Sequence, residues 1–144
     1  MSTFLLEIIT PERIAFSDQV EMVTAPSALG VIGILHGHVP LFARLTEGEV
    51  KITKKGEDYY LAIGGGFLEV TPSKAVILVT SAYHADEINE QEVLQAKRRA
   101  EEALAEKPTG SALAEAQSSF RRSLIAMKVM RRKRGSSRKI AIPS

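Results

Sequence analysis

Few side chains in this sequence have the types and spacing that catalysis requires. The chain has three histidines and no cysteine, which excludes a thiol nucleophile, a thiolate metal site and a disulfide framework. It has no Gly-x-Ser-x-Gly motif and no nucleophile with an obvious base. His36 and His38 form a His-x-His motif with no third ligand nearby in sequence, so we expect a structural or interfacial role for them. The residues therefore indicate no autonomous catalysis and no metal site.

Three consecutive glycines, Gly64 to Gly66, invite comparison with a phosphate-binding loop. Such a loop lies between a strand and a helix N-terminus, and the P-loop version continues into Lys and Ser or Thr. Here strand-like residues follow, and Gly-Lys-Ser/Thr is absent. We therefore predict a tight turn or bulge between two strands.

The strongest electrostatic feature is a basic C-terminal part. Residues 1–88 hold 6 Lys/Arg and 11 Asp/Glu, whereas residues 89–144 hold 13 and 6. One explanation of these basic residues is structural: positive charge complements the dipole at a helix C-terminus. The functional explanation is that the basic part docks onto an acidic protein surface. The alternative is a basic arm that binds nucleic acid or an anionic membrane, although Trp is absent and no stacking platform is evident. From residue 121 onward the basic residues are Arg121, Arg122, Lys128, Arg131, Arg132, Lys133, Arg134, Arg138 and Lys139.

The elements that must position these residues change in type near residue 88. Before it, short apolar runs of period two are separated by Pro, Gly and charged turn residues. This pattern predicts an antiparallel β-sandwich or flattened barrel. The run from Ala75 to Thr80 is continuously apolar, so we expect a strand buried on both faces.

After residue 88 the composition favours two helices. Asn89 fits an N-cap with Glu92 three residues on, and the first helix should end before Pro108. A short loop makes the helices antiparallel neighbours. Because small residues dominate one stripe and bury little area, we expect a hairpin that depends on docking and can leave its dock. The predicted stripes are Val93, Ala96, Ala100 and Leu104, then Leu113, Ala116, Phe120, Leu124 and Met127.

These patterns divide the chain into a β-sandwich over residues 1–88, a helical hairpin over 89–134 and a basic flexible tail over 135–144. No apolar run approaches the length of a membrane span, and the N-terminus lacks the features of a signal or transit peptide. We therefore expect the chain to act where it is made.

Two motifs carry a resemblance to a known family. Residues 33–41 read Gly-Ile-Leu-His-Gly-His-Val-Pro-Leu, and residues 65–70 read Gly-Gly-Phe-Leu-Glu-Val. Together with Thr10-Pro11-Glu12 and the segment 96–101, they closely resemble the epsilon subunit of bacterial F-type ATP synthase, in order along nearly the whole chain. The resemblance implies a flattened sandwich of ten strands followed by a helical hairpin.

The resemblance also implies a non-catalytic rotor subunit of the central stalk. The sandwich is expected to bind the gamma subunit and the c-ring and to couple proton-driven rotation to ATP synthesis, with the membrane reached only through the complex. The expected location is the cytoplasmic face of the bacterial inner membrane. His36 stands where the family usually has Pro, and an apolar residue stands where members often carry a polar or acidic one. Expected positions near gamma or the c-ring are Val31, His38, Pro40 and Leu41.

The hairpin is expected to fold beside the sandwich or to extend along gamma and restrain ATP hydrolysis. Extended, its basic helix would lie near acidic segments of the catalytic alpha and beta subunits. Partly buried Arg–carboxylate pairs there contribute about 1–3 kcal/mol each, whereas the same charges facing water in the folded-down state gain little. The expected inhibitory residues are Arg121, Arg122, Lys128, Arg131, Arg132, Lys133 and Arg134.

Some members of the family bind ATP through an Ile/Leu-Asp-x-x-Arg-Ala motif on the first helix, helped by arginines on the second. The matching positions here are Glu92, Gln95 and Ala96, with Arg122 and Ala126 on the second helix. Two expected cations are thus missing, each worth about 1.5–3 kcal/mol in a charge-assisted contact. We therefore expect no cofactor and no tight ATP site.

Overall fold

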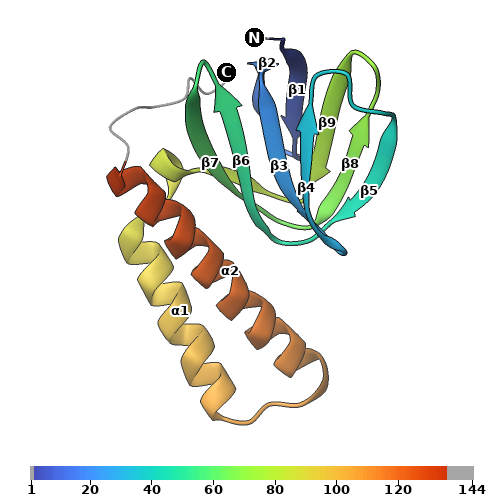
Figure 1. Ribbon diagram of the computed structural model, residues 1–144. Helices are drawn as coiled ribbons and strands as arrows, with labels where there is room; N and C mark the ends of the chain where they lie inside the picture. Colours follow the sequence, from blue (N-terminus) through green and yellow to red (C-terminus); the bar gives the residue numbers. More distant parts are fainter. Residues whose placement is uncertain (1, 136–144) are drawn as a thin grey trace.

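The computed structural model describes residues 2–135, with residues 133–135 described by their backbone alone. The chain forms a β-sandwich from which a helical hairpin projects to one side (Figure 1). The predicted flexible tail lies outside the described residues except for Gly135, which ends the second helix.

The sandwich is one hydrogen-bonded sheet of ten strands that curves over itself, as predicted. The strand order is β10-β7-β6-β3-β5-β8-β9-β1-β2, and β4 pairs with β3 off this path. Neighbouring strands are antiparallel apart from β1 and β9, which pair in parallel. The strands are β1 (Phe4–Ile9), β2 (Ile14–Val20), β3 (Met22–Ser27), β4 (Gly30–Leu35), β5 (Leu41–Leu45), β6 (Gly48–Lys54), β7 (Glu57–Ile63), β8 (Gly66–Val70), β9 (Lys74–Val79) and β10 (Ala82–His84).

The core lies between the two layers of the curved sheet. Alternate residues of each strand point inward, as Leu6 and Ile8 do on β1 and Val50 and Ile52 on β6. Among the described residues, every member of this core cluster lies on a strand, and none lies on a helix. The core cluster therefore lies within the sandwich, although Ile63 at the end of β7 also borders the hairpin.

The expectation for β9 is wrong in one respect. Ala75, Ile77 and Val79 are buried, but Leu78 is 48% exposed on the outer face. An apolar run shows that a strand lacks polar residues, but it cannot show whether a second layer covers the outer face. The strand is buried on one face only.

Ion pairs join the strands at the ends of the sheet. Arg13, in the turn between β1 and β2, donates to the backbone oxygen of Ala82 at 2.9 Å and to Glu87 Oε1 at 2.8 Å. Burial raises the pKa of Glu87, but the hydrogen bonds from Arg13 and the His84 amide outweigh it and hold the pKa below its usual value. Lys54 on β6 likewise pairs with Asp18 on β2.

The hairpin consists of α1 (Glu90–Ala105) and α2 (Gly110–Gly135), preceded by the short helix η1 (Ala85–Glu87). Asn89 caps α1 as predicted, its side chain accepting a hydrogen bond from the Glu92 amide at 3.2 Å. Ala100 and Ala116 are buried where the helices meet.

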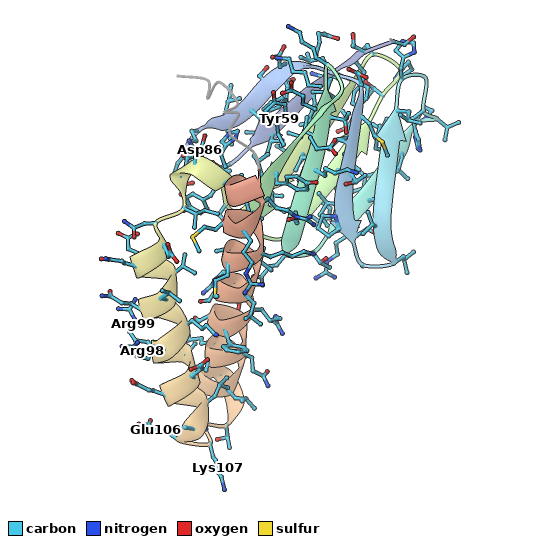
Figure 2. All side chains as sticks on the ribbon, turned by 60° about the vertical axis from the view of Figure 1, so that its left-hand side comes forward. Tyr59, Asp86, Arg98, Arg99, Glu106 and Lys107 are labelled. Carbon is cyan, nitrogen blue, oxygen red and sulfur yellow. The ribbon has the colours of Figure 1, made fainter. Side chains whose placement is uncertain are left out.

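The predicted stripe on α2 is wrong at Leu124. Leu124 is exposed, and the buried residues of this part of the helix are Ser123, Val129 and Met130. The reason is that α2 packs against η1, β7 and β6 as well as α1, so a stripe drawn for α1 alone does not predict which of its residues are buried. The rest of the hairpin projects away from the sandwich, and Arg98, Arg99, Glu106 and Lys107 point into solvent (Figure 2).

The glycine run connects β7 to β8, in agreement with the predicted structural role. A Cβ on Gly66 would lie 1.9 Å from the Leu78 carbonyl oxygen, whereas a Cβ on Gly65 would have its nearest neighbour at 3.6 Å. Only the first distance is a severe clash with backbone that cannot move aside.

We predict that Gly66→Ala lowers the free energy of unfolding by about 1–3 kcal/mol or more, because it forces β8 away from β9. Gly65→Ala is the matched control and should change it by less than about 1 kcal/mol. Denaturant titration of both variants measures the difference. Equal stability of the two variants would show that the close approach of β8 and β9 is not a constraint.

Candidate functional site

One continuous segment, residues 22–43, contains no charged residue, although 25% of the whole chain is charged. We call it the uncharged segment; it covers β3, β4 and the start of β5. Its most exposed large side chains are Leu29 (100%), Val31 (76%), Val39 (70%) and Phe42 (67%). A concentration of exposed apolar side chains typically marks a surface that a partner covers.

The four predicted partner-binding residues all lie on the uncharged segment, but they do not form one site. Val31 lies near the start of β4, whereas His38 and Pro40 lie in the loop after it and Leu41 begins β5. Five residues of extended strand separate the two ends by roughly 15 Å. Leu41 is half-buried against the core, so it supports the loop as well as lining the surface.

An aromatic pair extends this surface onto β5 and β8. The rings of Phe42 and Phe67 stack with centroids 5.4 Å apart, and Leu78 is opposite Phe67 on β9. All three are exposed on the outer face of the sheet. Sequence reasoning did not single them out, although Phe42 occupies a position where period two calls for a polar residue.

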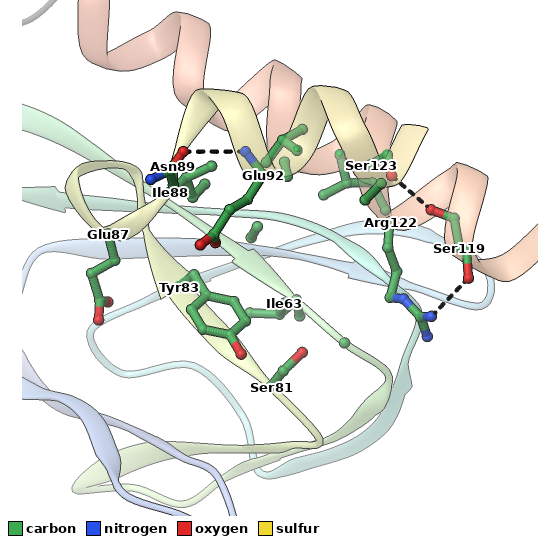
Figure 3. Close-up of a pocket in the computed structure, with 16 residues that line it drawn as sticks. Ile63, Ser81, Tyr83, Glu87, Ile88, Asn89, Glu92, Ser119, Arg122 and Ser123 are labelled. Atoms are coloured by element: carbon green, nitrogen blue, oxygen red, sulfur yellow. Dashed lines mark hydrogen bonds between the residues drawn. The ribbon is translucent and has the colours of Figure 1, made fainter. Parts of the chain in front are cut away.

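A pocket of about 390 Å³ lies between the hairpin and the sandwich (Figure 3). Its walls are the end of β7, the segment from β10 to η1, the first turns of α1 and the middle of α2. Of the degenerate ATP motif, the structure brings Glu92, Ala96, Arg122 and Ala126 to this pocket, but Gln95 is exposed outside it.

The charges around this pocket do not favour a triphosphate. Arg122 is the one cation among the lining residues, and Glu87 and Glu92 are the two carboxylates. Arg122 is also held along its own helix, where it donates to Ser119 Oγ at 3.2 Å and to Ser118 Oγ at 3.4 Å. Glu87 is neutralised by its ion pair with Arg13, so Glu92 remains against Arg122 and the lining offers no net positive charge to an anionic ligand.

The basic side chains of α2 point in different directions. Arg121, Lys128 and Arg131 are exposed on the helix, whereas Arg122 borders the pocket. The side chains of Lys133 and Arg134 lie outside the described part of the chain.

Arg132 departs from the expectation that these charges face water in the folded-down state. Its Nε and Nη2 atoms each donate to Glu49 on β6, to Oε2 and Oε1, at 3.3 Å. Its guanidinium also lies 4.7 Å from the centroid of the Tyr60 ring on β7. The hydrogen bonds to Glu49 raise the pKa of Arg132 above its ordinary value.

We call the end of α2 with Val129, Met130 and Arg132 the docking contact: α2 packs against η1, β7 and β6, and Arg132 meets Glu49 and Tyr60. Val129 and Met130 are buried, and full burial of such side chains contributes about 1.5–3 kcal/mol each. The Arg132 side chain is 45% exposed, so its ion pair contributes less than about 1 kcal/mol. A contact of this size holds the hairpin without making it part of the core.

His36 and His38 belong to no metal-ligating cluster in the part of the chain that the structure describes. The His38 Nδ1 atom lies 2.7 Å from the Val39 carbonyl oxygen. Within residues 2–135, no helix combines the length and apolar character that crossing a membrane demands.

Comparison with known families matches both parts of the chain. Residues 3–85 match the family described as the ATP synthase delta/epsilon chain, beta-sandwich domain. Residues 86–130 match the long alpha-helix domain of the same chain.

Individual relatives are similar over most of their length. The ATP synthase epsilon chain of Dehalococcoides mccartyi (strain CBDB1) is 41% identical over 135 residues, which cover 93% of this chain and 96% of the relative. That of Herpetosiphon aurantiacus is 41% identical over 129 residues, covering 90% and 95%. A chain in the mitochondrial ATP synthase of Euglena gracilis has the same fold, with a TM-score of 0.67, 18% identity and coverage of 96% of this chain and 83% of that one.

We predict that Arg132 and Glu49 are energetically coupled. In a double-mutant cycle with Arg132→Gln and Glu49→Gln, the coupling should be about 0.5–1 kcal/mol in the unfolding of the hairpin, followed by its helical circular dichroism. Glu7→Gln is the control, since Glu7 pairs with Lys74 on strands remote from the hairpin. Additive effects of the two substitutions would show that the ion pair does not hold the hairpin.

Proposed function

The chain belongs to the delta/epsilon family of ATP synthase subunits, and on that premise we propose that it is an epsilon-type rotor subunit. In this role it binds the gamma subunit and the c-ring, couples proton-driven rotation to ATP synthesis and restrains ATP hydrolysis through its helices. It carries out no catalysis itself and reaches the cytoplasmic face of the bacterial inner membrane only through the complex.

The observation that carries the proposal is the order of the two matched domains over nearly the whole chain, at 41% identity to epsilon chains. The structure also supports the proposal, because the two parts of the chain present different surfaces. The sandwich has its own core and an uncharged outer segment, whereas the basic side chains are concentrated on a helix that docks through a small contact.

The uncharged segment and the Phe42–Phe67 pair are the surface that we assign to the rotor partners. An interface that turns together with a shaft has to resist shear. A well-packed apolar centre with aromatic anchors provides that resistance. We place gamma at the loop with His38 and Pro40 and at the adjoining β5 surface. The tip that carries Leu29, just before β4 begins, is then the part assigned to the c-ring.

The exposed cations Arg121, Lys128 and Arg131 are the best candidates for inhibition among the described residues of α2. Within the described part of the chain no ion pair joins them to a carboxylate, so a contact with acidic catalytic subunits would be gained without a loss. Arg132 instead exchanges Glu49 for another acid, and its net contribution to the extended state is therefore smaller. Differential contact of this kind shifts a two-state equilibrium.

The alternative function, binding of nucleic acid or an anionic membrane through the basic arm, predicts a steep loss of affinity with salt. The proposed interface with gamma has an apolar centre and should survive moderate salt. Co-purification of the chain with gamma at moderate salt distinguishes the two functions, and loss of gamma under these conditions would contradict the proposal.

We predict that changing Arg121, Lys128 and Arg131 together to Gln raises ATP hydrolysis by the assembled complex and leaves its assembly and ATP synthesis intact. A total loss of about 1.4 kcal/mol in the extended state would lower the ratio of extended to folded-down chains roughly tenfold. Truncation after residue 88 removes the whole hairpin and should therefore give the largest rise in ATP hydrolysis. Arg98→Gln with Arg99→Gln, both exposed on α1 (Figure 2), is the matched control. Unchanged hydrolysis after truncation would refute the inhibitory role.

We propose further that the hairpin has no tight ATP site. Calorimetric titration of the chain with ATP should detect no micromolar binding. Glu92→Asp together with Ala126→Arg, both at positions that line the pocket, should raise the affinity by at least about tenfold. Gln117→Arg is the control: it adds a cation elsewhere on α2 and should not raise the affinity for ATP. Micromolar binding by the unaltered chain would contradict the proposal.

A further inference from the structure

The edge of β4 is the least protected edge of the sandwich. Within the described residues, β4 pairs with β3 alone. The strands at the ends of the sheet order, β2 and β10, are tied by side chains, through the Lys54–Asp18 pair and through Arg13 bound to Ala82. No ion pair is found on β4, which has no charged residue.

The direction of the free backbone groups follows from the neighbours of β3. The Pro26 oxygen accepts a hydrogen bond from the Thr46 amide at 2.9 Å, and the Ala28 amide donates to the Arg44 oxygen at 3.3 Å. Residues 26 and 28 therefore face β5. Because backbone groups alternate along a strand, residues 23, 25 and 27 face β4.

The register then assigns the groups of β4 itself. Residues 23, 25 and 27 lie opposite Ile34, Ile32 and Gly30, so these three direct their backbone groups toward β3. Val31 and Gly33, which alternate with them, direct their N–H and C=O groups away from the sheet. The six-residue strand thus offers a free hydrogen-bonding edge along its middle.

Native proteins usually protect such an edge with charges, Pro or a bulge. β4 has none of these: its register with β3 is continuous, and it contains neither Pro nor a charged residue. Val31 and Leu35 are exposed beside the edge, and Gly33 between them has no side chain to obstruct a second strand.

We propose that β4 accepts one extended, uncharged segment of the gamma subunit as an added strand. This inference rests on the proposed function, which assigns gamma to the loop that directly follows β4. An extended occupant is required because the free groups are those of a strand edge. An uncharged, apolar occupant is required by charge complementarity, because a charged segment would lose hydration here and find no opposite charge in residues 22–43.

Amide hydrogen exchange of the full chain, free and bound to gamma, tests the proposal. In the free chain, Val31 and Gly33 should exchange fast and Ile32 and Ile34 slowly, since the latter two bond to β3. With gamma bound, exchange at Val31 and Gly33 should slow by at least about tenfold. If gamma binds and these two amides still exchange fast, the added strand is refuted and the proposed function stands. If gamma does not bind at all, the proposed function fails as well.

Slow exchange of Val31 and Gly33 in the isolated chain, together with a doubled mass in solution, would assign the edge to a second copy and overturn the proposal.

A pair of variants separates the backbone from the side chain at the same position. Val31→Pro removes the outward N–H but leaves the β3 ladder intact, and Gly30 before it accommodates proline. Val31→Thr keeps the N–H and nearly the same shape. Val31→Pro should weaken the binding of gamma about fivefold more than Val31→Thr does. Equal affinities of two folded variants would overturn the proposal, and the exchange measurement decides it if Val31→Pro does not fold.

Discussion

The sandwich completes its apolar core without the helices, and the rest of the molecule depends on this separation. Every core residue in the described part lies on a strand, so the fold of the sandwich does not require a docked hairpin. The hairpin is held mainly by Val129, Met130 and the Arg132–Glu49 pair at the end of α2. These contacts amount to about 3–7 kcal/mol, so we expect docking to be an equilibrium that a partner with enough differential affinity can shift.

The distribution of charge differs between the sandwich and the hairpin, and it supports the proposal that they bind different partners. An uncharged segment with exposed apolar and aromatic side chains suits permanent assembly, since it gains most when water is excluded. Exposed cations on α2 suit a conditional contact, because their gain depends on meeting an acidic surface. In the proposed extended state Arg132 would give up Glu49 for another acid, so we expect it to favour extension less than its neighbours do.

Local sequence patterns predicted most of the fold. The alternation of apolar and polar residues predicted the strands, and Asn89 with Glu92 predicted the start of α1. Leu78 and Leu124 were misjudged because their burial depends on what packs against the outer sheet face and the end of α2. Of the candidate sites, the basic helix was visible in composition, whereas the docking contact was not. Glu49 and Arg132 are 83 residues apart, and only the fold brings them together.

Native-state hydrogen exchange across a denaturant series tests the separation of the two bodies most directly. Core amides of the sandwich, such as those of Ile52 and Leu61, should exchange only through global unfolding. The amides of Val129 and Met130 should exchange through a smaller opening of lower free energy that leaves the sandwich protected. One common opening free energy for both sets of amides would contradict the account, because the hairpin would then be an integral part of the fold.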